Sequence, residues 1–126
     1  MKTTNDRRVL IIVTSLAALL LGLSWHKAHG AEPNFNPFAD AVRRSEGVWW
    51  YGVNVTVKTE AEARQVCLNT LRHAWADWNG QGNFINFAAD RYCPPQCDRK
   101  GNLNWKRNVR LMLPKAYRRQ LTKGVL

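Results

Sequence analysis

Three cysteines are the residues of this 126-residue chain best suited to covalent or metal chemistry: Cys67, Cys93 and Cys97. The last two stand four positions apart in "CPPQC", followed by Asp98. A c-type haem attachment site needs a histidine directly after its second cysteine. A thioredoxin-like site has two residues between its cysteines at the start of a helix, whereas three lie between these. The spacing therefore excludes both sites.

A zinc site needs four ligands, usually cysteine and histidine. Beyond residues 1–30 the chain offers its three cysteines and a single histidine, His73. Cys67 and His73 are six positions apart on a predicted helix, which places them about 120° apart around its axis. This geometry is poor for a shared metal ion, so we expect no metal site and no cofactor.

Disulfide formation remains, because small domains in oxidising compartments usually cross-link their cysteines. Pairing Cys67 with Cys93 or Cys97 is slightly favoured, and it would close a loop of about 27–31 residues, worth about 3–4 kcal/mol. A local Cys93–Cys97 bridge is the alternative, but Cys93 and Pro94 both precede a proline and so prefer extended backbone. The absence of any bridge is the third and least favoured outcome. Either pairing leaves one thiol over, which could link a second copy in a disulfide-linked dimer.

The side chains for acid–base catalysis are few. His73 lies four positions before Asp77, which favours a solvated pair on the polar side of the helix. Asp77 and Asp90 are the best remaining pair of carboxylates, but no pattern in the sequence brings them together. We therefore assign no catalytic residue and expect a protein that is not an enzyme, with a hydrolase using Asp77 or Asp90 as an alternative.

Positive charge is concentrated at the C-terminal end. The formal net charge is +10, and no acidic residue follows Asp98. A cationic segment of this kind attracts polyanions. The candidate residues for binding an anionic partner are Arg99, Lys100, Lys106, Arg107, Arg110, Lys115, Arg118, Arg119 and Lys123.

Aromatic residues interleave with these cations, as in surfaces that stack on sugars or bases. Trp50, Trp105 and Tyr117 are the candidate exposed contacts, whereas Trp75 and Trp78 are expected in the core.

Residues 1–30 have the three-part layout of a secretory signal peptide: basic residues, an apolar run from 9 to 23 and the small residues of "AHG". The alternative is an uncleaved membrane anchor, since residues 9–25 reach the lower limit of about 17 residues for a spanning helix. In either case we expect an exported protein, periplasmic or extracellular, or anchored in the inner membrane.

The remaining chain predicts an α+β fold. Residues 31–46 are expected to form an extended arm, 47–114 the α+β domain and 115–126 a basic C-terminal tail that either adds a short helix or trails free. Two-residue alternation predicts a strand over 47–57, and "TEAE" predicts a capping box that starts a long amphipathic helix ending before "NGQG". Further strands are predicted over 83–92 and 104–114, giving a three-stranded β-α-β-β sheet with one helix packed on it.

These features favour a basic, envelope-associated binding or adaptor protein that acts on an anionic surface or an acidic partner, of the kind that a conjugation or secretion apparatus employs. Its partner would be a protein or an anionic envelope polymer or lipid; nucleic acid is less favoured. One alternative is a small secreted inhibitor or immunity-type protein that blocks an enzyme through the Cys-Pro-Pro loop. The other is the small hydrolase.

Overall fold

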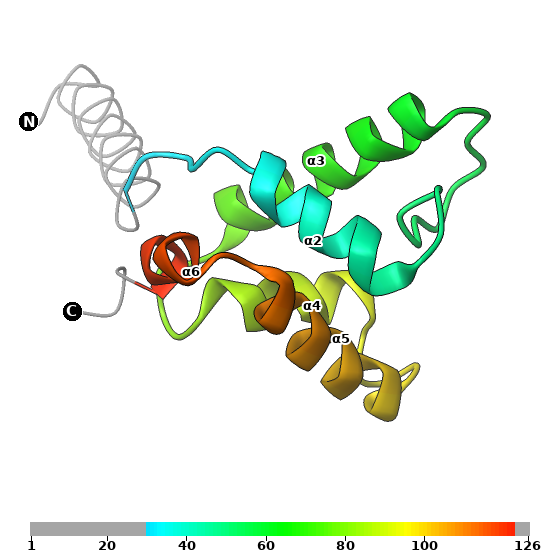
Figure 1. Cartoon of the computed structure of the whole chain (residues 1–126). Coiled ribbons are helices and arrows are strands. Elements are labelled where there is room, and N and C mark those ends of the chain that lie inside the picture. The colour runs from blue at the N-terminus through cyan, green and yellow to red at the C-terminus, as the bar shows by residue number, and fades with distance from the viewer. Residues whose placement is uncertain (1–29, 123–126) are drawn as a thin grey trace, which may run out of the picture.

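The computed structural model describes residues 30–122, which form five α-helices and no strand (Figure 1). The predicted α+β fold with its three-stranded sheet is therefore wrong. The helices are α2 (Asn36–Glu46), α3 (Glu60–Asp77), α4 (Phe84–Tyr92), α5 (Arg99–Met112) and α6 (Lys115–Thr122). The predicted leader or anchor lies outside the described residues except for its last position. No helix within 30–122 is long and apolar enough to cross a membrane.

The long helix α3 was predicted correctly. The backbone N–H of Glu62 donates to Thr59 Oγ1 at 3.2 Å, and the carboxylate of Glu62 accepts from the backbone N–H of Lys58 at 2.8 Å. The helix start is thus capped on both sides, although the returning bond reaches Lys58 rather than Thr59. Its inward face buries Ala63, Cys67, Leu68, Leu71, Ala74 and Trp75.

Residues 47–57 form turns rather than a strand. Gly47 ends α2 in the left-handed conformation, at φ 68°. Tyr51 and Gly52 also have positive φ, at 57° and 64°, and the N–H of Val53 closes their turn on the carbonyl of Trp50 at 3.1 Å. Positive φ is incompatible with an extended strand, so the alternation of apolar residues does not build a sheet here.

Residues 83–92 contain α4. The side chain of Asn83 accepts from the N–H of Ile85 at 2.8 Å and so caps the helix. Phe84, Ile85, Ala88 and Ala89 are buried. These four residues form two adjacent pairs about one helical turn apart, which is the pattern of a buried helix face. A strand would bury every second residue instead.

Most of residues 104–114 lie in α5. The side chain of Asp98 caps the start of this helix by accepting a hydrogen bond from the N–H of Gly101 at 2.8 Å. Trp105, Val109 and Leu113 are buried. Their spacing of four is shared by one face of a strand and one face of a helix, so it does not distinguish the two.

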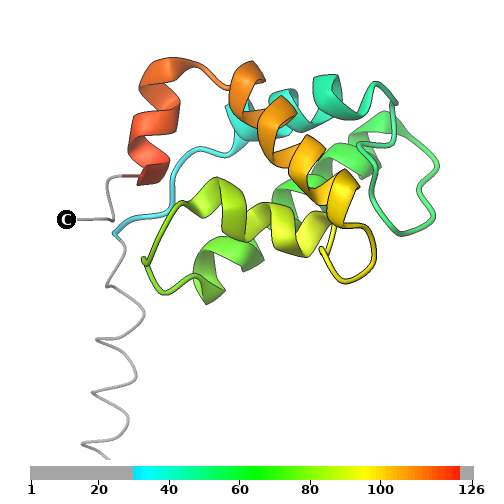
Figure 2. The same ribbon diagram turned by 90° about the horizontal axis from the view of Figure 1, so that it is seen from below.

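Both ends of the domain are more ordered than the sequence suggested. The predicted extended arm becomes α2 from Asn36 onward, and this helix buries Phe38, Ala39, Ala41 and Val42. In the predicted tail, α6 buries Tyr117 and Leu121. The hydroxyl of Tyr117 donates to the carbonyl of Asn34 at 2.7 Å, which fastens α6 to the segment leading into α2. Figures 1 and 2 show the two segments side by side.

A cluster of aromatic rings joins the helices. Phe84 of α4 lies with its ring centroid 5.0 Å from Trp75 of α3 and 6.1 Å from Phe38 of α2. Trp105 of α5 lies 6.2 Å from Phe38 and stacks on Tyr92 at 5.3 Å. These contacts fix the relative positions of α2 to α5, and with them the orientation of the outward face of α5 (Figure 2).

Candidate anion-binding surface

Arginines in the first part of the domain are largely neutralised by neighbouring carboxylates. Ion pairs with N···O distances of 2.6–3.3 Å join Arg43 to Glu60, Arg64 to Asp40 and Arg72 to Glu32. A further close pair joins Arg91 to Asp77. Most of the positive charge of this region is therefore paired within the molecule.

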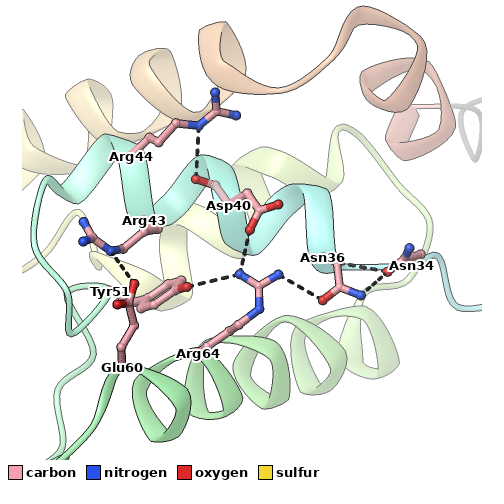
Figure 3. Close-up of polar contacts among 8 residues, drawn as sticks. All are labelled: Asn34, Asn36, Asp40, Arg43, Arg44, Tyr51, Glu60 and Arg64. Atoms are coloured by element: carbon pink, nitrogen blue, oxygen red, sulfur yellow. Dashed lines mark hydrogen bonds and ion pairs between the residues drawn. The ribbon is translucent and has the colours of Figure 1, made fainter.

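Arg64 is the most connected of these cations (Figure 3). One terminal nitrogen donates to Asp40 Oδ1 at 2.6 Å and to the hydroxyl of Tyr51 at 3.1 Å, and the other donates to Asn36 Oδ1 at 3.1 Å. The hydrogen bond with Asp40 raises the pKa of Arg64, followed in size by that with Tyr51. The guanidinium thus joins α3 to α2 and to the turn between them, which is a structural role.

The cations of α5 and α6 are arranged differently. Within residues 30–122 only Lys106 has an ion pair among them, with its Nζ 2.9 Å from Asp90. Seven others have no ion pair in that range. We call these seven the basic surface: Arg99, Lys100, Arg107, Arg110, Lys115, Arg118 and Arg119. Lys123, the remaining candidate, lies outside the described residues. This part of the predicted anion-binding set is therefore available to an external partner.

Two exposed leucines lie among the cations of α5. At about 100° per residue, Leu103 and Leu111 fall in the same outward arc as Arg99, Lys100, Arg107 and Arg110, an arc roughly 120° wide. Leu103 is 58% exposed and Leu111 is 73% exposed. In the strand predicted over 104–114, Leu111 shares a face with Val109 and Leu113, so sequence reasoning missed this combination. One signal was available in the sequence. Trp105, Val109 and Leu113 recur every four residues and so share one face of a helix, whereas Leu103 and Leu111 fall outside this series and would lie on another face.

Two shallow hollows adjoin the basic surface. One, of about 340 Å³, lies between α4 and α5 and is lined by Asn86, Leu103, Lys106, Arg107, Arg110 and Leu111. The other, of about 330 Å³, is lined by Asn83, Ile85, Arg110, Lys115, Arg118, Arg119 and Thr122. Arg110 contributes to both, and its guanidinium donates to Asn86 Oδ1 at 3.4 Å.

The predicted aromatic contacts are only partly right. Trp50 is 43% exposed and forms an edge-to-face pair with Trp49, which is also exposed. Trp105 and Tyr117 are buried in the core and contribute no contact surface. Trp75 and Trp78 are buried, as expected.

The structure has no disulfide: Cys67, Cys93 and Cys97 are free thiols. Cys67 lies in the core, and burial raises its pKa to about 11. Burial also raises the pKa of Cys93, whose sulfur lies 3.9 Å from the carbonyl of Asp98. Neither the slightly favoured bridge from Cys67 nor the local Cys93–Cys97 bridge is formed in the structure. The "CPPQC" loop is still a compact turn, in which the N–H of Cys97 donates to the carbonyl of Pro94 at 3.0 Å.

The carboxylates considered for catalysis hold structural partners. Asp77 pairs with Arg91. Burial tends to raise the pKa of Asp90, but hydrogen bonds from Lys106 and Asn102 outweigh it, so the pKa is lowered. His73 is exposed on α3. Among residues 30–122, no group of three histidine, cysteine or acidic side chains could hold a metal ion.

One acidic residue that sequence reasoning did not single out is unusual. Burial raises the pKa of Glu46, and the neighbouring indole of Trp105 offsets this in part. The carboxylate of Glu46 lies directly against Gly52. A Cβ added at Gly52 would lie only 2.6 Å from Cδ of Glu46. Only the tertiary fold brings Glu46 into this position, so no sequence signal could have identified it.

No protein-family model, curated protein or solved structure matches this chain.

Proposed function

We propose that this is a binding protein of the cell envelope that attaches to an anionic lipid surface through α5 and α6. The observation that carries the proposal is the difference in pairing between the two parts of the domain. Four of the six described cations before residue 99 are in ion pairs, whereas seven of the eight described cations from residue 99 onward have none. Unpaired cations held on ordered helices provide a persistent positive field for an anionic partner.

The leucines favour a lipid surface among the anionic partners. Interfacial helices combine cations, which contact lipid headgroups, with apolar side chains that enter the boundary of the acyl chains. Leu103 and Leu111 project from α5 between such cations. Long arginine and lysine side chains can extend to the headgroups while their stems cover apolar surface. A basic residue near an anionic bilayer contributes about 1 kcal/mol.

The course of the chain agrees with this assignment. Tyr117 fastens α6 to Asn34, so the cations of α6 lie near the segment through which the chain enters the domain. The apolar run of residues 9–25 precedes that segment by only a few positions. If this run is retained as the predicted anchor, α6 lies close to the membrane, where clustered basic residues bind anionic lipid. A place as an adaptor in a conjugation or secretion apparatus stays a prediction.

The proposal is tested by vesicle flotation with the purified protein. Neutral phosphatidylcholine vesicles are compared with vesicles that also contain phosphatidylglycerol, at about 50 mM and about 500 mM salt. We expect the anionic lipid to increase binding at low salt and high salt to remove most of that increase. Any insertion by the apolar run contributes to both vesicle types, so the difference between them reports the basic surface.

Matched variants locate the surface. The double change Lys100→Gln and Arg107→Gln should weaken the lipid-dependent part of binding by about 30-fold, since each cation contributes about 1 kcal/mol. Lys58→Gln is the control, because Lys58 is exposed and lies outside α5 and α6. Equal binding to both vesicle types, or an equal effect of the control, would contradict the proposal.

A further inference from the structure

We infer that the hollow between the start of α4 and the α5–α6 junction is a binding site for a phosphate group. This inference deepens the proposed function, on which it rests, by assigning one ligand chemistry to one part of the basic surface. The hollow has a volume of about 330 Å³, at the lower end of the ~300–1,000 Å³ range of small-ligand sites.

The charge of the hollow is the first argument. Arg110 comes from α5, Lys115, Arg118 and Arg119 come from α6, and no acidic residue lines the space. Like charges that converge in one hollow repel one another unless an anion lies between them. In the first part of the domain carboxylates meet this need for arginine, as Asp40 does for Arg64. Here the described chain supplies none.

Arg118 provides the second, independent argument. Its Nε is buried and has no hydrogen-bond partner within the described residues. Buried side-chain donors are nearly always hydrogen-bonded, and an unpartnered one calls for a missing acceptor. The guanidinium is a planar fork of five donors, which matches the geometry of phosphate oxygens in two parallel bonds. Arg118 lines the hollow, so a phosphate there would accept from the terminal nitrogens of this fork.

The remaining wall of the hollow is compatible with an anion. Asn83 lines the hollow and caps α4 with its side-chain oxygen. The cap does not use the NH2 group of this side chain. The positive end of the α4 dipole lies at this wall, and anions are favoured near a helix N-terminus. Thr122 donates its hydroxyl to backbone carbonyls of α6 and is therefore a neighbour rather than a donor to the ligand.

A phosphate group reaches such a site either as a lipid headgroup or as a free phosphate. Isothermal titration of the purified protein with inorganic phosphate tests the site directly. We expect saturable binding that Arg119→Gln weakens about tenfold, in line with the loss of a hydrogen bond to a charged group. Arg118→Gln should have a similar effect. Arg119 is exposed, so its variant keeps the test valid if Arg118→Gln fails to fold. Lys58→Gln is the control and should leave the titration unchanged.

Competition distinguishes the two sources. Vesicles containing phosphatidic acid are titrated with and without excess inorganic phosphate. Saturable binding of inorganic phosphate that also displaces the vesicles supports a site open to free phosphate. A headgroup site is supported by a different result: the protein binds the phosphatidic acid vesicles, Arg119→Gln abolishes that binding, and inorganic phosphate does not bind.

The inference is overturned if neither form binds saturably, or if Lys58→Gln weakens binding as much as Arg119→Gln does. Its failure is separable from that of the proposed function. Salt-sensitive binding to phosphatidylglycerol that depends on Lys100 and Arg107, but not on Arg118 and Arg119, would retain the lipid surface and remove the phosphate site.

Discussion

Arginine has two roles in this protein, and its partners decide which role a given residue takes. Arg64 is enclosed by an aspartate, an asparagine and a tyrosine hydroxyl (Figure 3). Arg118 has a buried Nε with no partner in the described chain. The first geometry is complete and stabilises the fold, while the second lacks an acceptor. An arginine contributes to binding only where the fold leaves its donors unused.

Replacing Arg64 with methionine should lower the free energy of unfolding by about 1–2 kcal/mol. The change removes three hydrogen bonds at a partly exposed position, where each contributes modestly. Urea denaturation monitored by circular dichroism measures the loss, and Lys58→Met serves as the control at an exposed position. Equal stabilities of the two variants would show that the contacts of Arg64 do not stabilise the domain.

The buried thiol of Cys67 should make the domain sensitive to alkali. Its pKa is about 11 in the folded protein against 9.0 as the ordinary value. Between these values the unfolded chain loses the thiol proton and the folded protein keeps it, so stability falls as pH rises from about 9 to about 11. The loss cannot exceed about 3 kcal/mol for this group, and burial of Tyr92, which raises its pKa, acts in the same direction.

Urea denaturation at pH 8 and at pH 10.5 measures this effect. Cys67→Ala should reduce the difference in stability between the two pH values, while Cys97→Ala, which removes an exposed thiol, should leave it unchanged. An unchanged difference in Cys67→Ala would assign the alkaline sensitivity to other groups.

Among the elements, the spacing of apolar residues explains why a strand was predicted over residues 104–114, most of which lie in helix α5. Trp105, Val109 and Leu113 recur every four residues, which suits a strand face and a helix face equally. Leu111 separates the two, because a strand would bury it with Leu113 and a helix turns it outward. The N-cap of Asp98 and the aromatic contacts of Trp105 favour the helix.

This register can be tested directly. Leu113→Ala should destabilise the domain by about 2–5 kcal/mol, since it removes a buried side chain. Leu111→Ala should change stability by less than about 0.5 kcal/mol, as at most surface positions. Thermal denaturation of the two variants measures both values. Similar losses in the two would indicate that both leucines lie on one buried face.

At the scale of the whole molecule, the ends of the described chain are fastened together. The hydrogen bond between Tyr117 and Asn34 joins residues 83 positions apart, and Figure 2 shows α6 beside the segment that enters α2. This arrangement brings the cations of α6 toward Asn34, near the start of the described chain. Charge and chain entry thus lie in one region of the molecule.

Tyr117→Phe should loosen this fastening without unfolding the core. We expect faster hydrogen exchange in residues 30–35, since the change removes one hydrogen bond of about 1 kcal/mol. Amides in the first turns of α5, a helix that packs on α2 and α4, provide the internal control and should exchange at their original rates. Unchanged exchange in residues 30–35 would show that other contacts hold the segment.

The sequence by itself determined the long helix α3, its capping residues, the two buried tryptophans of its C-terminal end and the concentration of positive charge after Asp98. These features depend on neighbours along the chain: a cap, a periodic face and a run of like charges. Only the tertiary structure decided that the remaining elements are helices and that four of the five described arginines before Asp98 are in ion pairs. It also decided that Trp105 and Tyr117 are buried while Leu103 and Leu111 are exposed. Spacings that suit two secondary structures are resolved by packing against distant residues, and whether a charge is free depends on which carboxylates the fold brings near it.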